Sequence, residues 1–510
     1  MSSSDDALGG LAESAAVVFV GLVAGRLLSL LGQVLVARTL GPTTFGHVAL
    51  AYTVVATLGT LALLGTHEGV TRQMSAADSP AARRRILRSG YATALVGALL
   101  VTAVVYLARF RIAAALGDDR LPGLLVVFLP FLVANATARV SFGALRTFGR
   151  SAAAAVARDL GPRVVALAAF GLFVVAGDAV GGAVAYWVAA PVVMTLLTVV
   201  YLRRELAVDR VVARLPDAET TRRLWSFSWP LAVGSSFFVV LSNVDVLMIS
   251  YFMDPRSVGL YRAIQPLQQV TTFVLAAFTF LFLPLATGYY ERGEYDALDR
   301  LYTVSTKWVV ALTFPAVLVF VLFAPDVVRA FFGAAFVPAA PALAVLVAGL
   351  FVRTLVGLNG DVTKAIDRPQ IELYAVAVAV VVDVALNAAL IPRYGIVGAA
   401  AATVVGYATY NALEVAAIYR VAGTHPFAAN TVKPLVPTTL VALGVERLTA
   451  GAPRTLPFLV GIGALLAAVH LASLVLTRSL DAADVTLFER LEDRTGVDLG
   501  RVKMLLRRSQ

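Results

Sequence analysis

Long apolar stretches separated by short polar breaks follow one another along almost the whole chain. A helix needs about 20 mostly apolar residues to cross the hydrocarbon core of a bilayer. Stretches of that length predict an all-α polytopic membrane protein with about fourteen spanning helices. They lie near residues 14–38, 44–70, 87–108, 121–145, 152–176, 179–202, 225–252, 257–288, 300–323, 338–362, 371–391, 396–419, 431–449 and 455–477.

The composition agrees with this pattern. Of 510 residues, 59% are hydrophobic and only 15% are charged, which is too little charge for a soluble chain of this length. The net charge of +10 is carried by short loops between apolar stretches, so it indicates membrane topology and not a nucleic-acid surface. The chain has no cysteine, which excludes disulfides and thiolate metal sites. We expect no metal, no cofactor and no nucleic-acid partner.

Basic residues predict the orientation in the membrane. They concentrate in the loops that follow even-numbered helices, above all in residues 203–223, which places these loops in the cytoplasm. Both termini are then cytoplasmic, and the membrane is the plasma membrane. The acidic start of the chain lacks the basic region of a cleaved signal peptide, so we expect the first helix to be retained.

Similar turns predict that the helices form two repeats. The segment Gly41-Pro42-Thr-Thr-Phe-Gly46 resembles Asp254-Pro255-Arg-Ser-Val-Gly259, 213 residues later. Two further similarities, beginning at Arg146 and Lys364 and at Ala179 and Gly395, have offsets of 218 and 216 residues. Both repeats start on the same side of the membrane, as parallel repeats do. The predicted parts are an N-lobe (1–203), a basic linker (204–223), a C-lobe (224–420), two further helices (430–478) and an amphipathic cytoplasmic tail (479–510).

Several arginines fall at membrane depth, where a charge costs about 2.5–3.5 kcal/mol on insertion scales. In the first helix, Arg26, Ser29 and Gln33 form one polar stripe at i, i+3 and i+7. In the fourth helix, Asn135 and Arg139 share a face. Because the planar guanidinium binds phosphate through two parallel hydrogen bonds, we expect an anionic substrate. The candidate substrate-binding residues are Arg26, Ser29, Gln33, Arg139, Arg262 and Arg353.

Pairs of polar residues in other helices are candidates for gating or ion coupling. Asp245 and Arg262 lie at similar depth on adjoining helices, either as a structural salt bridge or as a pair that opens during transport. Asp383 and Asn387 share a face near the middle of a helix and form a candidate coupling site. The candidate gating and coupling residues are Asp245, Asn243, Asp383, Asn387, Glu68 and Arg72.

Three pairs are spaced to neutralise each other within a helix. Asp361 and Lys364 lie on one face of the tenth helix together with Arg353 and Gly357. Asp159 with Arg163, and Glu68 with Arg72, are both at i, i+4. We expect these pairs to be structural, although Glu68 and Arg72 also lie where a cytoplasmic gate would close.

Four motifs, in this order along the chain, resemble a known superfamily: Leu40-Gly41-Pro42-Thr-Thr-Phe-Gly46, Gly65-Thr-His-Glu-Gly-Val-Thr-Arg72, Asp245 with Gly259-Leu-Tyr-Arg-Ala263, and Ile391-Pro-Arg-Tyr-Gly395-Ile-Val-Gly398-Ala-Ala. They are similar to the multidrug/oligosaccharidyl-lipid/polysaccharide exporter superfamily, in particular its Wzx-type polysaccharide-transporter branch. The resemblance implies two lobes, alternating access, and a cationic cavity that binds a polyprenyl- or dolichyl-phosphate-linked glycan. It also implies that Arg26 and Arg262 are basic cavity residues. The second helix has fewer basic residues than the lipid II branch of the superfamily.

Three functions remain open from the sequence. The first is a flippase for a lipid-linked oligosaccharide, acting as a monomer among membrane lipids, with the glycosylation machinery as a candidate partner. The second is a drug/cation antiporter of the same superfamily, although Arg26 makes the expected cavity basic. The third is a membrane glycan polymerase or ligase, which the short outer loops and the lack of a catalytic motif disfavour. The coupling energy could be a sodium gradient, a proton gradient or the membrane potential.

Overall fold

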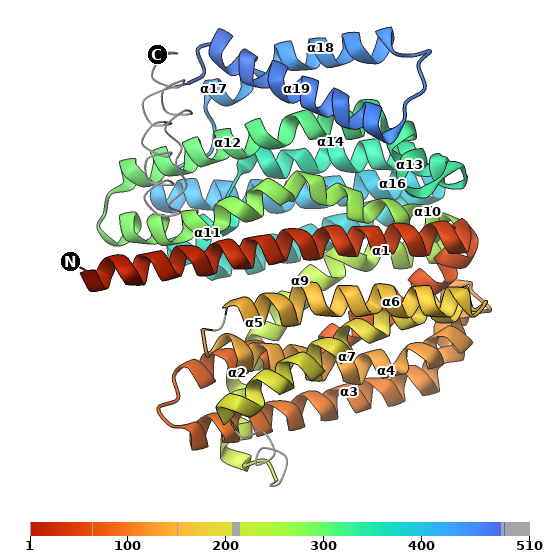
Figure 1. The fold of residues 1–510 in the computed structure, drawn as a ribbon, viewed down its shortest axis with the longest axis vertical. Coiled ribbons are helices and arrows are strands. Elements are labelled where there is room, and N and C mark those ends of the chain that lie inside the picture. Colours follow the sequence, from red (N-terminus) through yellow and green to blue (C-terminus); the bar gives the residue numbers. More distant parts are fainter. Residues whose placement is uncertain (1, 64, 150, 207–214, 481–483, 485–510) are drawn as a thin grey trace. The chain divides into compact units, whose positions relative to one another are not determined.

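The computed structural model describes residues 2–63, 65–149, 151–206, 215–480 and 484. Every regular element in these ranges is a helix, which confirms the all-α prediction (Figure 1). Within them, eight helices are long and apolar enough to cross a membrane, or nine if one bent pair counts as a single span. Two of the eight, Gly21–Ala62 and Gln370–Ala422, are 42 and 53 residues long and each contains a break. The number of fourteen spans stays a prediction.

Contacts divide the chain into two units, which we call the N-unit (Glu13–Ala263) and the C-unit (Ile264–Gln510 with Met1–Ala12). The elements from the start of the chain to the end of the N-unit are α1 (Ser2–Ala62), α2 (Thr66–Ser75), α3 (Pro80–Leu116), α4 (Leu121–Arg146), α5 (Ser151–Ala155), η1 (Val156–Leu160), α6 (Gly161–Val175), α7 (Ala179–Leu206), α9 (Ala218–Phe252) and α10 (Pro255–Ile264). Those of the C-unit are η2 (Gln265–Gln269), α11 (Val270–Glu291), α12 (Tyr295–Leu322), α13 (Ala324–Phe332), η3 (Ala334–Ala339), α14 (Ala340–Val356), α15 (Asn359–Ala365), α16 (Pro369–Ala422), α17 (Ala429–Val432), α18 (Leu435–Leu448) and α19 (Leu456–Leu476).

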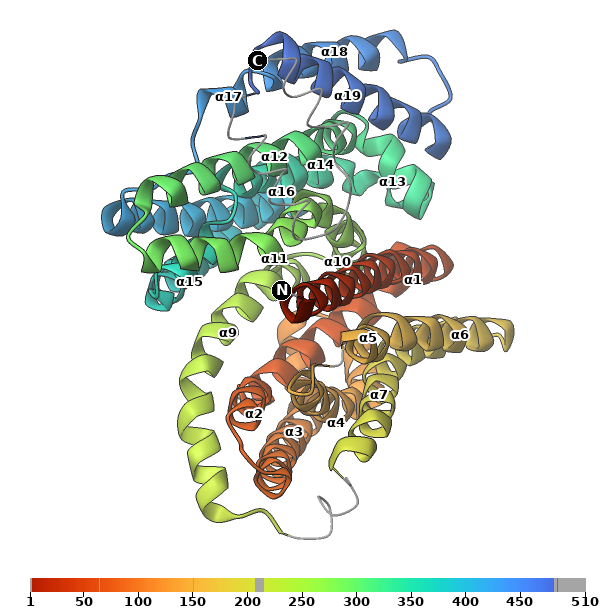
Figure 2. The same cartoon turned by 60° about the vertical axis from the view of Figure 1, so that its left-hand side comes forward.

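In the N-unit, α3 packs on α4, α4 on α7, and α7 on α6 (Figure 1). The long helix α9 packs against α2 and α3 and so belongs to the N-unit, although its sequence lies in the predicted C-lobe (Figure 2). Asp217 caps the start of α9 by accepting hydrogen bonds from the hydroxyl and the backbone N–H of Thr220, which hold the pKa of Asp217 below its usual value. The division into lobes at residues 204–223 stays a prediction.

Glycines with positive φ produce the breaks that the repeats predicted. Gly41 (φ 68°) interrupts α1 and Gly395 (φ 58°) interrupts α16. Side chains disfavour this left-handed region, so a glycine at each position allows the chain to turn between two helices. Each break is close to a proline, Pro42 or Pro392, that cannot continue the backbone hydrogen bonding of the preceding helix. The predicted ends of the first and eleventh helices are therefore confirmed.

Other predicted helices are interrupted, and these predictions were wrong. The predicted helix 44–70 stops at Ala62, and α2 starts after Gly65, whose φ is 68°. The predicted helix 338–362 ends at Val356 because Gly357 adopts φ 65° and ψ −127°. The predicted helix 257–288 contains a 3₁₀ turn with Pro266 between α10 and α11. The predicted helix 431–449 breaks at Pro434. In each case one glycine or proline overrides a continuous apolar pattern.

In the C-unit, α14 packs between α12 and α16, while α11 packs on α12 and α15. The hairpin of α18 and α19 lies beside α12 (Figures 1 and 2). Much of α12 is buried, including Tyr302 and Trp308, because neighbouring helices cover several of its faces. The C-unit therefore has its own core, centred on α12.

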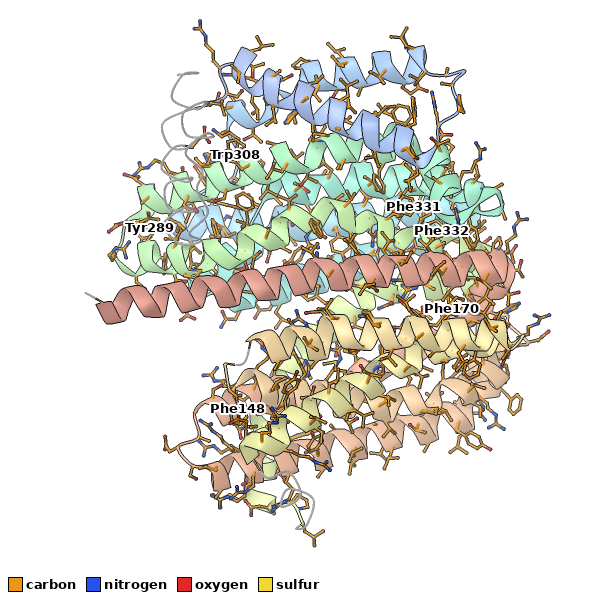
Figure 3. All side chains as sticks on the ribbon, viewed as in Figure 1. Phe148, Phe170, Tyr289, Trp308, Phe331 and Phe332 are labelled. Atoms are coloured by element: carbon orange, nitrogen blue, oxygen red, sulfur yellow. The ribbon has the colours of Figure 1, made fainter. Side chains whose placement is uncertain are left out.

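A buried ion pair attaches the segment after α19 to the centre of α12. Lys307 donates to the carboxylate of Asp484 at 2.7 Å and to the carbonyl of Ser479 at 3.1 Å. The indole N–H of Trp308 donates to the other carboxylate oxygen of Asp484 at 2.8 Å; Figure 3 labels Trp308 on α12. Apart from residues 479, 480 and 484, the predicted amphipathic tail lies outside the described residues.

Candidate functional site

Arg26 lies on the first half of α1, where two glycines allow a close helix contact. A Cβ atom built on Gly21 would come within 2.8 Å of the Cβ atom of Ala155, and one built on Gly25 would come equally close to Asp159. Small residues four positions apart let membrane helices approach closely. The spacing of Gly21 and Gly25 is visible in the sequence, and our sequence analysis missed it. Asp159 lies in η1, a π-helical turn of a type that is often found at functional sites.

This contact brings Arg26 close to charged groups. The Asp159 carboxylate attracts the Arg26 guanidinium, and Arg158 repels it. Arg158 binds Asp159 through two parallel hydrogen bonds of 2.9 Å each, so Arg158 takes the place that we predicted for Arg163. The Asp159 carboxylate thus attracts two guanidinium groups, those of Arg158 and Arg26.

The other members of the predicted stripe on α1 are bound to each other and to α7. The Gln33 amide donates to the hydroxyl and the carbonyl of Ser29, at 3.4 Å each. The Tyr186 hydroxyl donates to the same carbonyl at 3.2 Å. Gly32 lies directly against the Tyr186 ring, so the absence of a side chain there lets α7 approach. The stripe is therefore connected to the aromatic residues of α7.

Arg139 and Arg262 both lie close to Tyr52, which the sequence analysis did not single out. The Arg262 guanidinium lies over the Tyr52 ring, 5.9 Å from its centroid. Tyr52 also interacts electrostatically with Arg139, whose Nε lies 3.5 Å from the side-chain oxygen of Asn135 on the same face of α4. The predicted Asn135–Arg139 face is confirmed. Two of the four predicted arginines thus have Tyr52 as a neighbour.

An aromatic cluster supports the Tyr52 ring. Trp187 stacks on Tyr52, with centroids 4.9 Å apart and an angle of 18° between the planes. Phe131 meets the ring edge-on at 5.5 Å, and Phe128 lies 6.2 Å away. Stacked and edge-to-face arrangements are the stable geometries for aromatic pairs. Phe128 and Phe131 are three residues apart on α4, but Tyr52 lies in α1 and Trp187 in α7, so no spacing along one helix predicts the cluster.

Asp245 is buried in α9 and interacts electrostatically with Arg262 of α10, as the sequence analysis proposed. One carboxylate oxygen of Asp245 accepts a hydrogen bond of 2.8 Å from the backbone N–H of Val246. Asn243 donates to the backbone carbonyl of Val239 at 2.9 Å, one turn earlier in the same helix. Whether Asp245 and Asn243 take part in gating stays a prediction.

Glu68 and Arg72 of α2 were predicted to pair with each other, but the structure gives each of them other neighbours. Glu68 lies 3.9 Å from His67, and Arg139 attracts its carboxylate. The Arg72 guanidinium lies 4.9 Å from the centroid of the Phe227 ring of α9. The role of Glu68 and Arg72 in a gate stays a prediction.

In the C-unit, Arg353 lies near the end of α14, with its guanidinium 5.8 Å from the centroid of the Tyr407 ring. Lys364 lies 3.9 Å from Asp361, so the predicted neutralising pair is confirmed. The break at Gly357 separates Arg353 from this pair, and the single continuous face that we predicted for all of these residues is wrong.

Asp383 and Asn387 are fully buried in the first half of α16. The Asn387 amide donates to the Asp383 carbonyl at 2.9 Å, as expected for residues one turn apart. A Cβ atom on Gly406, in the second half of α16, would lie 2.9 Å from the Cβ atom of Asp383. Within the described residues, the Asn387 side-chain oxygen has no hydrogen-bond partner.

A second buried polar cluster of the C-unit was missed in the sequence analysis. It consists of Tyr410, Asn411 and Glu414 on α16 and Asn359 at the start of α15. The spacing of Tyr407, Tyr410, Asn411 and Glu414 is i, i+3, i+4 and i+7, so the sequence does contain the signal. Glu414 is also the only charged residue of the predicted helix 396–419.

Comparison with known proteins gives a consistent result. A family model described as "Polysaccharide biosynthesis protein" matches residues 11–287, more than half of the chain. The chain is also similar to a protein of Haloferax volcanii named as the probable low-salt glycan biosynthesis flippase Agl15. The two share 24% identity over 404 residues, which cover 79% of this chain and 82% of that protein.

Two solved structures show the same fold. The lipid II flippase MurJ in an inward closed conformation has a TM-score of 0.72 at 13% identity, covering 89% of this chain and 97% of that one. A multidrug resistance transporter of the MATE family, in an inward-facing conformation, has a TM-score of 0.60 at 16% identity, covering 81% and 95%. The fold expected from the sequence motifs is therefore confirmed.

Proposed function

Because the chain belongs to the family of polysaccharide biosynthesis proteins, we propose that it is a flippase for a lipid-linked oligosaccharide. The cargo is a glycan on a polyprenyl or dolichyl phosphate or pyrophosphate, moved across the plasma membrane by alternating access. Both termini face the cytoplasm in this proposal. The names of the Haloferax relative and of the MurJ structure, both flippases, support it.

One observation carries the proposal: the N-unit holds Arg26 and Arg139 within the apolar helices α1 and α4, and Arg262 in the short helix α10, over the Tyr52 ring. Insertion of each charge into a membrane is unfavourable, so charged residues at this depth are typically kept because they bind a substrate or take part in a conformational change. Arg139 and Arg262 lie near one tyrosine, and the Asp159 carboxylate, which binds Arg158, attracts Arg26. Guanidinium groups in this setting suit a phosphate or pyrophosphate.

The cargo of such a site is amphipathic. Its phosphate and sugars need polar partners within the protein, whereas its isoprenoid chain is stable in the hydrocarbon of the bilayer. The protein surface offers apolar side chains to that hydrocarbon, for example Leu107, Leu172 and Leu196. A flippase can therefore bind the head group alone and leave the lipid chain outside.

A drug/cation antiporter is the second candidate, because Asp245 and Asp383 are buried acids and the MATE fold is similar. A site for an organic cation would need an acidic lining. The N-unit instead has arginines at the positions where the superfamily resemblance implies cavity residues. We therefore favour the anionic cargo.

We propose that Asp383 and Asn387 couple transport to an ion gradient. Both side chains are fully buried, and the Asn387 oxygen has no donor within the described residues, which leaves an acceptor for a cation or a proton-bearing group. Sodium, protons and the membrane potential remain the candidate energy sources. We expect a monomer that works beside the enzymes that build and use the glycan.

Lipid analysis of a deletion strain tests the proposed function. Without the protein, the lipid-linked glycan should accumulate in the cytoplasmic leaflet, and the surface glycan should disappear. Re-expression of the wild-type chain should reverse both changes. A deletion strain with normal surface glycan and no accumulated lipid-linked glycan would contradict the proposal, provided that the genome holds no second copy of the gene.

A further inference from the structure

Glu414 is a fully buried carboxyl group whose hydrogen bonds come from uncharged groups. The Asn359 amide donates to one of its oxygens at 2.6 Å, and the Tyr410 hydroxyl donates to the other at 2.9 Å. The same Asn359 amide donates to the side-chain oxygen of Asn411 at 2.9 Å. In the described residues, none of the ion pairs includes Glu414.

The unfavourable free energy of burying such a carboxyl group can be offset in two ways. An ionised carboxylate in an apolar interior needs a nearby cation, whereas a protonated carboxyl group needs only hydrogen-bond partners. Ionisable residues in membrane helices are often found in proton relays of transporters. Glu414 lies eight residues before the end of α16, which is about 12 Å by helix rise.

Charged and titratable groups approach Glu414 from each neighbouring element. Arg353 of α14 and Lys364 of α15 attract its carboxylate, and Glu372 of α16 repels it. Tyr302 of α12 and Tyr410 of α16 also interact with it electrostatically. Asp361 of α15 forms an ion pair with Lys364 and interacts with Arg353. Of the two cations that attract Glu414, Lys364 forms a described ion pair and Arg353 does not.

Arg353, which is itself one of the candidate substrate-binding residues, lies beside this cluster. Its guanidinium lies over Tyr407, which is on the same face of α16 as Tyr410 and Glu414. A negative charge on Glu414 attracts Arg353 and repels any anion that approaches the guanidinium. A proton on Glu414 removes both effects.

We propose that Glu414 is a proton-binding site, and that its protonation makes Arg353 available to the phosphate of the cargo. The carboxylate takes one proton from water when an anion binds and returns it when the anion leaves. Because coupling between two bound ligands is reciprocal, the anion also favours protonation. The link to the cargo rests on the proposed function, whereas the proton-binding step does not.

The first test measures proton binding without any cargo. Infrared difference spectra of the purified full-length protein, recorded across a pH titration, detect the carbonyl band of a protonated carboxylic acid. The wild type should show, besides the signal of the other carboxyl groups, a component of this band that appears as the pH falls, and Glu414→Gln should lack that component. The control Glu291→Gln, at an exposed helix end, should retain it. A spectrum of Glu414→Gln identical to that of the wild type would overturn the proposal.

Glutamine keeps a side-chain oxygen for Asn359 and Tyr410, so we expect the variant to fold. A second variant makes the test independent of that expectation. Tyr410→Phe leaves Glu414 in place and removes one of its donors, which should shift the pH at which the band appears. A band that persists in Glu414→Gln and stays unchanged in Tyr410→Phe would belong to another carboxyl group and overturn the proposal.

The second test measures coupling to an anion, with farnesyl diphosphate as a soluble isoprenoid probe. Calorimetric titrations give the affinity of this probe for the wild type and for Glu414→Gln at each pH. The protonation of the probe itself affects both affinities equally, so it cancels in their ratio. We expect Glu414→Gln to bind more tightly at high pH by at least about fivefold, the low end of measured couplings, and equally at low pH. A ratio that does not change with pH would overturn the coupling.

The two proposals fail in different ways. If wild-type protein and Arg353→Gln bind farnesyl diphosphate equally, Arg353 is not a phosphate ligand, and the coupling to Arg353 is wrong. If neither binds it while the infrared band still depends on Glu414, proton binding stands and the anionic cargo of the proposed function is in error.

Discussion

Gly46 and Gly259, which the two repeats place at equivalent positions, are in direct backbone contact. A Cβ atom built on Gly46 would lie 3.0 Å from the amide nitrogen of Gly259, and one built on Gly259 would lie 2.9 Å from that of Gly46. Each glycine also lies against the carbonyl of the proline that starts the other turn: Gly46 against Pro255, and Gly259 against Pro42. The contact is reciprocal, as expected for two copies of one turn that face each other across a pseudo-twofold axis.

This contact predicts that a methyl group at either glycine destabilises the N-unit. The nearest atoms belong to the backbone and cannot rotate away, so Gly46→Ala or Gly259→Ala should lower the stability by about 1–3 kcal/mol, as other overpacking substitutions do. Thermal unfolding of the purified protein in detergent measures the change. Gly461→Ala is the control, because Gly461 lies in α19 with no atom in its way. Equal melting temperatures for all three variants would show that the turns do not pack closely.

The buried pair of Lys307 and Asp484 predicts a large effect from single substitutions. Removal of one partner leaves the other charge buried, which costs about 3–5 kcal/mol, whereas two apolar replacements avoid that cost. Lys307→Met and Asp484→Leu should each lower the melting temperature strongly, and the double variant should recover most of the loss.

The exposed pair of Arg292 and Glu294 is the matched control for this experiment. These side chains are 55% and 45% exposed, so water screens their interaction. Glu294→Gln should leave the melting temperature unchanged. A double variant of Lys307 and Asp484 that is no more stable than the single variants would contradict the account of a buried ion pair.

The position of Arg262 over Tyr52 predicts that the aromatic ring, more than the hydroxyl, holds the guanidinium in place. Cation–π contacts contribute about 0.5–2 kcal/mol, which corresponds to a change of about 2- to 30-fold. Tyr52→Phe should retain most transport in cells, and Tyr52→Leu should reduce it by that factor. The surface pair of Tyr106 and Arg109 provides the control, since Tyr106→Leu removes a similar contact away from the site. Equal losses of transport in Tyr52→Phe and Tyr52→Leu would show that the aromatic ring does not hold the Arg262 guanidinium in place.

Asp245 and Arg262 predict a non-additive double mutant. Both Asp245→Asn and Arg262→Gln should impair export, because each leaves a charge without its neighbour. If the two act as a pair, the double variant should be no worse than either single variant, with a coupling of more than about 0.5 kcal/mol. Export rates in cells with equal protein levels measure this coupling. Losses that simply add would show that the residues act independently.

The sequence predicted those parts of the fold that depend on local chemistry. Apolar length predicted the helices, and glycine with proline predicted the breaks at Gly41 and Gly395. The breaks at Gly65 and Gly357 were missed because an isolated glycine in an apolar stretch is compatible with a continuous helix. Whether such a glycine adopts positive φ depends on the neighbouring helices, which the pattern does not contain.

The candidate site was predictable only where one helix carries it. The stripe of Arg26, Ser29 and Gln33 follows from helical spacing, whereas the approach of Asp159 to Arg26 depends on a contact between α1 and η1. Tyr52 joins groups from α4, α7 and α10, so no spacing along one helix reveals it. Long-range packing of this kind has no signature in a single sequence.

The most direct test of the central claim is transport in proteoliposomes that hold purified protein and the lipid-linked oligosaccharide of the host. A glycan-cleaving enzyme added outside reports each molecule that reaches the outer leaflet. We predict that wild-type protein makes the inner pool accessible, that Arg26→Ala abolishes this without a change in melting temperature, and that Arg111→Ala, at an exposed position, transports normally. An inner pool that stays protected from the enzyme with wild-type protein, or full transport by Arg26→Ala, would contradict the account.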